Sequence, residues 1–169
     1  EVSMTTNGLG LAKVAGALAE AGLARVNISL DTLQPERFAE ITRRDRFDDV
    51  VEGLAAADAA GLRPVKVNSV LQRGINDDEA VDLTRWAVER GYELRFIEQM
   101  PLDAQHSWER TEMITGQEIL ASLRAEFDLE ELPGRGAAPA ERFRIDGGPA
   151  TVGVVASVTM PFCGSCDRL

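Results

Sequence analysis

The regular alternation of β-branched and helical segments over residues 1–101 constrains the fold of this chain more than any other feature. Strand-like segments occur at 2–6, 25–30, 65–71 and 93–97. Apolar residues at helical spacing predict helices at 11–21, from Pro35 onward, at 47–60 and at 77–89. Because strands that alternate with helices of about 10–15 residues form βαβ units, the pattern indicates an α/β protein with a parallel sheet.

Polar or sulfur-containing side chains follow each of the four strand-like segments. They are Thr5-Thr6-Asn7, Ser29-Leu30-Asp31, Lys66-Val67-Asn68-Ser69 and Glu98-Gln99-Met100. Right-handed crossovers place the carboxyl ends of parallel strands on one rim. Binding sites of barrels and of open sheets form at that rim, so the sequence predicts a ligand site there.

The pattern changes after Pro101. The expected elements are a loop at 101–114, a helix at 116–127, a connector rich in Pro, Gly and Ala at 128–141, and a hairpin made of 143–148 and 151–158. The Gly147-Gly148 pair supports the hairpin, because glycine permits the positive φ angles of tight hairpin turns. The sequence therefore divides near Pro101 into a part with alternating strands and helices and a part with a different pattern.

Charge and hydropathy exclude several classes of partner. The 169 residues carry a formal net charge of −10, which argues against a nucleic-acid surface because phosphate backbones bind to Lys and Arg patches. No apolar run is long enough to cross a bilayer and no signal peptide is recognisable, so we expect a cytoplasmic protein without membrane contact. An anionic ligand needs a local group of cations. The Arg43-Arg44-Asp45-Arg46 cluster is most simply a solvated segment between two helices, and the alternative, phosphate binding, has no second supporting feature.

Cys163 and Cys166 are the two cysteines of the chain. Their Cys-x-x-Cys spacing lets two thiolates converge on one metal, with a redox dithiol, half a zinc site and two free thiols as alternatives. Redox pairs usually lie near a βαβ unit, whereas this pair follows a hairpin, so a metal site is favoured. Its other ligands would lie outside this chain or be non-protein, because the single histidine, His106, is expected in a solvated loop.

The remaining candidates have a structural interpretation beside the functional one. Lys66 either reaches solvent from an edge strand or projects into a pocket from an interior strand. Arg168, beside the cysteine pair, is either a surface charge or an anion clamp. The hydroxyls of Thr5 and Ser29 are of a kind that commonly satisfies backbone groups at strand ends, and Met100 is of a kind that commonly fills a core.

Six strings taken together resemble one family. They are Met4-Thr5-Thr6-Asn7-Gly8, Asn27-Ile28-Ser29-Leu30-Asp31-Thr32-Leu33, Ile41-Thr42-Arg43-Arg44, Val65-Lys66-Val67-Asn68, Arg95-Phe96-Ile97-Glu98-Gln99-Met100-Pro101 and Pro161-Phe162-Cys163-Gly164-Ser165-Cys166-Asp167-Arg168-Leu169. In this order and at these intervals, the chain resembles the GTP 3′,8-cyclase family of radical S-adenosylmethionine (SAM) enzymes, which opens molybdenum cofactor biosynthesis.

The resemblance implies an incomplete (β/α) barrel, related to the TIM barrel, whose open side is covered by a C-terminal segment. On this basis residues 1–101 form part of the barrel, and residues 102–169 lead into a second iron–sulfur cluster site. The implied GTP contacts are Thr5, Lys66 and Arg168. The implied SAM contacts are Ser29 and Met100, and the implied ligands of the second 4Fe–4S cluster are Cys163 and Cys166.

The implied reaction is a lyase-type radical cyclisation of GTP to (8S)-3′,8-cyclo-7,8-dihydroguanosine 5′-triphosphate, with SAM and two 4Fe–4S clusters as cofactors. The family also implies a homodimer. Two departures matter: the family's N-terminal Cys-x-x-x-Cys-x-x-Cys motif does not occur in this sequence, and the third ligand of the second cluster is expected beyond Leu169. We therefore expect a chain truncated at both ends and inactive alone.

Three other functions compete with this interpretation. A radical SAM enzyme with a different substrate would share the barrel and a C-terminal cysteine region. A non-catalytic zinc-binding or redox Cys-x-x-Cys module would bind zinc or form a reversible disulfide without affinity for GTP. A sugar-phosphate barrel enzyme would remain active after Cys-to-Ser changes, because it would not need the cysteine pair.

Overall fold

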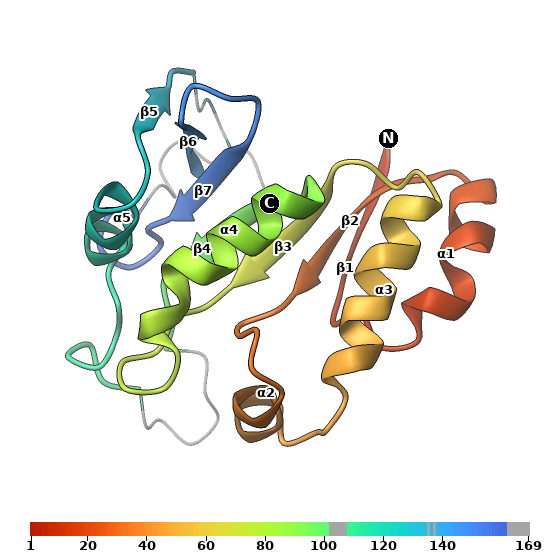
Figure 1. Ribbon diagram of the computed structural model, residues 1–169, viewed down its shortest axis with the longest axis horizontal. Coiled ribbons are helices and arrows are strands. Elements are labelled where there is room, and N and C mark those ends of the chain that lie inside the picture. Colours follow the sequence, from red (N-terminus) through yellow and green to blue (C-terminus); the bar gives the residue numbers. More distant parts are fainter. Residues whose placement is uncertain (102–107, 135, 137, 162–169) are drawn as a thin grey trace. The chain divides into compact units, whose positions relative to one another are not determined.

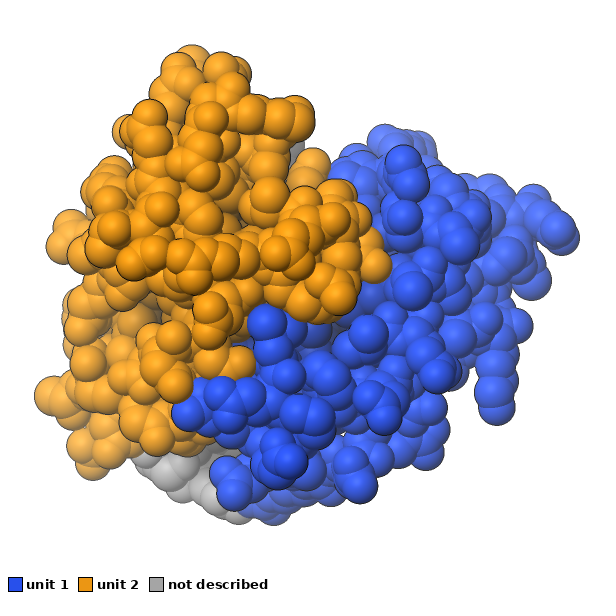
Figure 2. Space-filling view, in the orientation of Figure 1, with its two compact units in different colours: residues 1–69 blue, residues 70–169 orange. Residues whose placement is uncertain are grey.

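The computed structural model describes all residues except 102–107, 135, 137 and 162–169. Helices and strands alternate in an α/β arrangement, which confirms the predicted fold class (Figure 1). The chain contains two compact units, residues 1–69 and residues 70–169 (Figure 2). Among the described helices, none has the length and apolar character that crossing a membrane requires.

Unit 1 is a three-stranded parallel sheet with helices between its strands. Its elements are β1 (Val2–Thr6), α1 (Leu11–Glu20), β2 (Leu23–Ser29), α2 (Pro35–Thr42), α3 (Phe47–Ala59) and β3 (Val65–Ser69). Strand β2 pairs in parallel with β1 on one side and with β3 on the other. The parallel pairing predicted for these strands is therefore confirmed.

The core of unit 1 lies between the sheet and two helices, α1 and α3, which run side by side (Figure 1). The sheet contributes every second residue of its strands, including Val26, Ile28 and Val67, each fully buried. Helix α3 comes close to the loop after β1 at Gly53, where an added Cβ would lie 2.7 Å from the Gly8 carbonyl oxygen. A side chain at this position would push the helix away from the loop.

Unit 2 combines a parallel strand pair with an antiparallel meander. Its elements are the 3-10 helix η1 (Asp77–Glu79), α4 (Ala80–Arg90), β4 (Glu93–Ile97), α5 (Gly116–Arg124), β5 (Leu129–Leu132), β6 (Glu141–Ile145) and β7 (Thr151–Val155). Strand β4 pairs in parallel with β7, and β7 pairs antiparallel with β6. The predicted hairpin is confirmed, although its second strand ends at Val155 rather than at 158.

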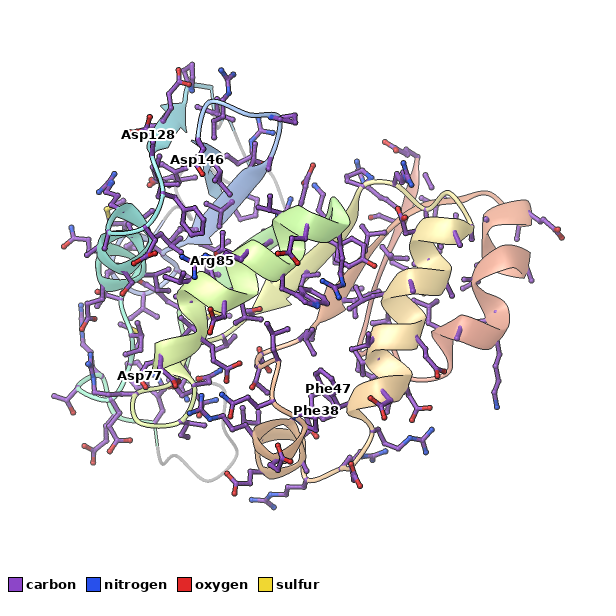
Figure 3. All side chains as sticks on the ribbon, in the orientation of Figure 1. Phe38, Phe47, Asp77, Arg85, Asp128 and Asp146 are labelled. Atoms are coloured by element: carbon purple, nitrogen blue, oxygen red, sulfur yellow. The ribbon has the colours of Figure 1, made fainter. Side chains whose placement is uncertain are left out.

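The structure corrects the predicted connector at 128–141, because β5 lies inside it and pairs antiparallel with β6. The sequence Leu-Glu-Glu-Leu has no β-branched residue, so local propensity gives no strand signal. Tertiary contacts fix the strand instead: the Asp128 amide donates to the Asp146 carboxylate at 2.8 Å, and the Asp146 amide donates to the Asp128 carbonyl at 2.8 Å (Figure 3). The left-handed turn residues are Asp146 and Gly147, one position before the predicted pair.

Candidate functional site

Polar side chains gather on one face of the unit 1 sheet. Thr5 pairs in register with Asn27, and Asn27 pairs with Lys66 on the third strand. Side chains of paired residues project from the same face of a sheet, and the Asn27 amide Nδ2 donates to the Thr5 hydroxyl at 3.2 Å. Two of the predicted GTP contacts, Thr5 and Lys66, therefore share one face.

The same face continues toward the carboxyl ends of β2 and β3. Ser29 pairs in register with Asn68, two residues beyond the Asn27–Lys66 pair, so both side chains project from the face that carries Thr5. We call this set of five residues the polar face: Thr5, Asn27, Ser29, Lys66 and Asn68. The Asn68 side-chain oxygen is buried and has no hydrogen-bond partner among the described residues. A buried acceptor without a donor costs free energy, and a ligand that donates a hydrogen bond would remove that cost.

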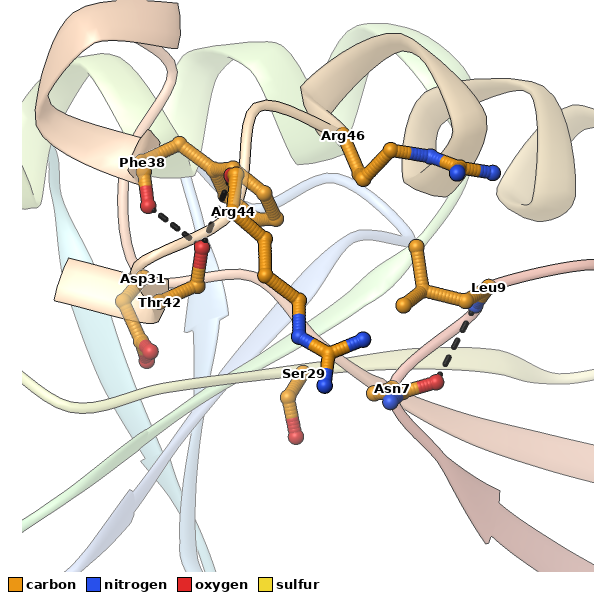
Figure 4. A pocket seen from close by; sticks show the side chains of 8 residues that line it. All are labelled: Asn7, Leu9, Ser29, Asp31, Phe38, Thr42, Arg44 and Arg46. Carbon is orange, nitrogen blue, oxygen red and sulfur yellow. Dashed lines mark hydrogen bonds between the residues drawn. The ribbon is translucent and has the colours of Figure 1, made fainter. Parts of the chain in front are cut away.

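Ser29 also borders a pocket of about 240 Å³ at the carboxyl ends of β1 and β2 (Figure 4). The residues that line it are Asn7, Leu9, Ser29, Asp31, Phe38, Thr42, Arg44 and Arg46. They come from the two strand ends, from α2 and from the 43–46 turn. The pocket therefore lies where the sequence predicted a ligand site.

Local contacts hold the 43–46 turn beside the pocket. The Thr42 hydroxyl donates to the Phe38 carbonyl at 2.7 Å and to the Arg44 carbonyl at 3.1 Å. Arg43 takes a left-handed conformation at φ 56°, which ends α2 and reverses the chain. The Phe38 and Phe47 rings meet edge to face at 5.8 Å and join α2 to α3 (Figure 3). These contacts fix the backbone from which the arginine side chains project.

The two arginines of the pocket differ in their surroundings. The Arg46 guanidinium donates to the Asp49 carboxylate, and this hydrogen bond and the Asp49 charge raise the pKa of Arg46. The Arg44 side chain points toward Ser29 (Figure 4) and forms no ion pair within the described part of the chain. From the residue types, this cluster is most simply a solvated segment, with phosphate binding as the unsupported alternative. Its place beside Ser29 depends on the reversal at Arg43, which the residue types alone do not reveal.

The remaining predicted residues belong to unit 2. Met100 follows β4 and is 40% exposed, so it is not core filler. The backbone beside it is held by Trp108, whose indole Nε1 donates to the Gln99 carbonyl at 3.1 Å. Cys163, Cys166, Arg168 and His106 lie outside the described residues. No group of three or more His, Cys, Asp or Glu side chains that would hold a metal occurs among the residues that the structure describes.

Comparison with known protein families assigns both parts of the chain. Residues 1–87 match the family model of the radical SAM superfamily, and residues 92–169 match the family model named Molybdenum Cofactor Synthesis C. The first match covers the unit that carries the polar face and the pocket. This chain belongs to the radical SAM superfamily.

The chain is also similar in sequence to individual proteins of known name. The chain is 65% identical to the GTP 3′,8-cyclase of Streptomyces coelicolor over 99% of its length and 50% of that relative. It is 57% identical to the GTP 3′,8-cyclase of Mycobacterium sp. strain KMS and to the GTP 3′,8-cyclase 2 of Mycobacterium tuberculosis strain H37Rv, over 99% of this chain and 48% of each relative. These similarities confirm the family resemblance. The chain spans about half the length of the curated relatives it matches.

Proposed function

We propose that this chain forms the SAM-binding and GTP-binding part of a GTP 3′,8-cyclase. The observation that carries the proposal is the polar face, because it brings Thr5, Ser29 and Lys66 together on adjacent strands. The radical SAM superfamily implies SAM and an iron–sulfur cluster. The relatives named GTP 3′,8-cyclase suggest GTP as the substrate.

SAM is assigned to the pocket beside Ser29. The Ser29 hydroxyl can donate to or accept from a ligand, and Arg44 supplies a planar cation suited to a carboxylate. Phe38 and Leu9 add apolar surface to the same pocket. A zwitterionic amino acid joined to a nucleoside needs this mixture of charge and apolar contact. Met100 remains a proposed SAM contact from the family resemblance.

GTP is assigned to the part of the polar face around Thr5 and Lys66. A triphosphate is repelled by a chain of net charge −10, so binding needs local cations. The Lys66 ammonium supplies one such charge, and Arg168 is proposed as another. The unpaired Asn68 oxygen, two residues from Lys66 on the same face, supports a ligand that offers N–H or O–H donors there.

The protein's own task in this proposal is positioning. Holding two ligands with their reacting atoms in contact removes the entropic cost of bringing them together, and excluding water protects a reactive intermediate. SAM with its iron–sulfur cluster supplies the radical chemistry when bound. We further propose a partial (β/α) barrel within residues 1–101, two 4Fe–4S clusters in the whole protein with Cys163 and Cys166 as ligands of the second, a homodimer, and a cytoplasmic location.

Binding measurements on the 169-residue chain test the site assignments. Lys66→Ala should weaken GTP binding about tenfold or more, because a hydrogen bond to a charged group contributes about 1.5–3 kcal/mol. Ser29→Ala should weaken SAM binding and leave GTP binding within about twofold. Lys13→Ala is the matched control, because Lys13 is the only other lysine and lies exposed on α1. Equal GTP affinity in the Lys66 and Lys13 variants would contradict the assignment.

Activity is tested with the complete product of the gene that encodes these residues. We expect the flanking DNA to encode a Cys-x-x-x-Cys-x-x-Cys motif upstream and a third cysteine downstream of Cys166. Under anaerobic reducing conditions the complete protein should convert GTP to the cyclised nucleotide only when SAM is present. The 169-residue chain alone should give no product. Turnover by the chain alone would overturn that expectation.

A further inference from the structure

Glu98 is a buried carboxylate that the proposed site does not use. It follows β4 directly, and its side chain is 1% exposed. Moving a carboxylate out of water is costly unless hydrogen bonds replace its hydration. The hydrogen bonds that Glu98 accepts therefore show which segments this buried carboxylate connects.

Four donors surround the Glu98 carboxylate. Oε1 accepts from the Gly116 amide at 2.8 Å and from the Thr159 hydroxyl at 2.5 Å. Oε2 accepts from the Val158 amide and from the Thr159 amide, each at 2.9 Å. One side chain thus joins the end of β4 to the first residue of α5 and to the turn that follows β7.

The surroundings favour the charged form of Glu98. Burial by itself raises the pKa of Glu98. The hydrogen bonds from Thr159, Gly116 and Val158 together lower the pKa by more than burial raises it, so the net shift is downward. The N-terminus of α5 adds a favourable dipole for an anion. Gly116 lets the start of α5 pack against β7, because a Cβ there would lie 2.9 Å from the Val154 side chain.

The joined segments carry proposed functional residues on both sides. Met100, the proposed SAM contact, lies two residues after Glu98, and Cys163, a proposed cluster ligand, lies four residues after Thr159. We propose that Glu98 is a positioning residue, whose carboxylate fixes Val158 and Thr159, which precede the proposed cluster ligands in the sequence, relative to the strand end that Met100 follows. This inference rests on the proposed function.

A purely structural role would not require a carboxylate. Apolar residues of similar volume often replace buried charges without loss of stability, since they avoid the cost of desolvation. A carboxylate instead fixes the orientation of its neighbours, because it accepts hydrogen bonds from three backbone N–H groups and one hydroxyl. Catalytic groups must be held within about 0.5 Å by their supporting contacts, and a carboxylate that accepts four hydrogen bonds provides this kind of support.

The test uses two pairs of variants in the complete protein, reconstituted anaerobically. Glu98→Gln keeps the shape but turns an N–H₂ group toward backbone donors, and Glu131→Gln, exposed on β5, is its control. Thr159→Val removes one donor and leaves the carboxylate and the three backbone donors in place, while Thr159→Ser restores the hydroxyl. If Glu98→Gln does not fold, the Thr159 pair decides.

Three quantities are measured: hydrogen-exchange protection of the Val158 and Thr159 amides, the EPR spectrum and iron content of the clusters, and kcat and KM for GTP. We expect Glu98→Gln and Thr159→Val to lower amide protection and kcat by about tenfold or more and to alter the spectrum. Thr159→Ser and Glu131→Gln should stay within about twofold of the unsubstituted protein.

Two results would overturn the inference. One is loss of amide protection with unchanged spectrum, iron content and kcat, which would make the Glu98 contacts structural only. The other is absence of protection at these amides in the unsubstituted protein. Failure of the proposed function gives a different result, namely no cyclised product from the unsubstituted protein despite intact protection. In that case, a lower iron content in Thr159→Val than in Thr159→Ser and the unsubstituted protein would still support the inference. Equal iron content in all three proteins would overturn it.

Discussion

The carboxyl ends of β2 and β4 present two opposite solutions to placing polar groups at a strand end. At β2, Ser29 is exposed beside a pocket, and its register partner Asn68 keeps a buried oxygen unpaired among the described residues. At β4, Glu98 is buried and accepts four hydrogen bonds from its own chain. Because satisfied groups stabilise the fold and unsatisfied ones leave room for a ligand, changes at the first end should act mainly on binding. Changes at the second end should act on stability as well as on the segments that Glu98 joins.

The largest stability effect is expected at Glu98. Glu98→Ala leaves the Gly116, Val158 and Thr159 amides without their acceptor, so the free energy of unfolding should fall by about 3 kcal/mol. Urea denaturation followed by circular dichroism measures the loss. Glu131→Ala, at an exposed position on β5, should change the value by less than about 0.5 kcal/mol. A loss below about 1 kcal/mol at Glu98 would contradict the contrast between the strand ends.

A somewhat smaller effect is expected in unit 1, away from its polar face. Gly53→Ala places a methyl group 2.7 Å from the Gly8 carbonyl oxygen, so α3 must shift, at a cost of about 2 kcal/mol. Gly16→Ala is the matched control, because nothing lies within 4 Å of an added Cβ at that position in α1. That change should raise the unfolding free energy by about 0.5–1 kcal/mol. Similar effects in both variants would show that the close approach is absent in solution.

Glu118 tests whether a partly exposed carboxylate contributes to the free energy of unfolding. The hydrogen bond from Arg73, with those from the Thr115 amide and hydroxyl, lowers the pKa of Glu118 from 4.5 to about 2. Because the folded-state pKa is depressed, this stabilisation is present above pH 4.5 and is lost as pH falls toward 2. The side chain is 46% exposed, which weakens the ion pair. The capping box that it forms with Thr115 should therefore provide most of the effect.

Glu118→Ala removes both the capping box and the ion pair, so it should reduce the unfolding free energy at pH 7 by about 1 kcal/mol. It should also flatten the decline in stability between pH 4.5 and pH 2. Urea titrations across that range measure both quantities, and added salt should reduce the ion-pair contribution. A variant with the same pH profile as the unsubstituted chain would show that Glu118 is not the group responsible.

The smallest stability change is expected at Ser29. The side chain is exposed at the pocket, so Ser29→Ala should change the unfolding free energy by less than about 0.5 kcal/mol. The affinity of the Ser29→Ala variant for SAM should nevertheless fall about fivefold to tenfold, because one hydrogen bond to the ligand is lost. Calorimetric titration measures the affinity, and urea denaturation measures the stability. Loss of stability without loss of affinity would reverse the roles assigned to the two strand ends.

Local patterns were sufficient to predict most of the strands and helices. The β-branched runs and the helical spacing predicted β1 to β4 and the helices between them, because these signals need only neighbouring residues. They failed at β5, where the strand exists only through pairing with β6. The polar strand ends predicted where Thr5 and Ser29 would lie, but not that Arg44 folds back to the same pocket. That placement follows from the left-handed turn at Arg43.

The sequence by itself determined the α/β class and the parallel strands of unit 1, and its family resemblance suggested most of the residues proposed to bind ligands, though not Arg44. Periodicity and strand-end chemistry act over a few residues, so they are visible without a structure. Only the tertiary structure showed that Thr5 and Lys66 share a face and that Glu98 is buried and fully hydrogen-bonded. The Glu98 contacts join residues 18, 60 and 61 positions apart. No local pattern encodes such partners, because the chain must fold before these donors and acceptors meet.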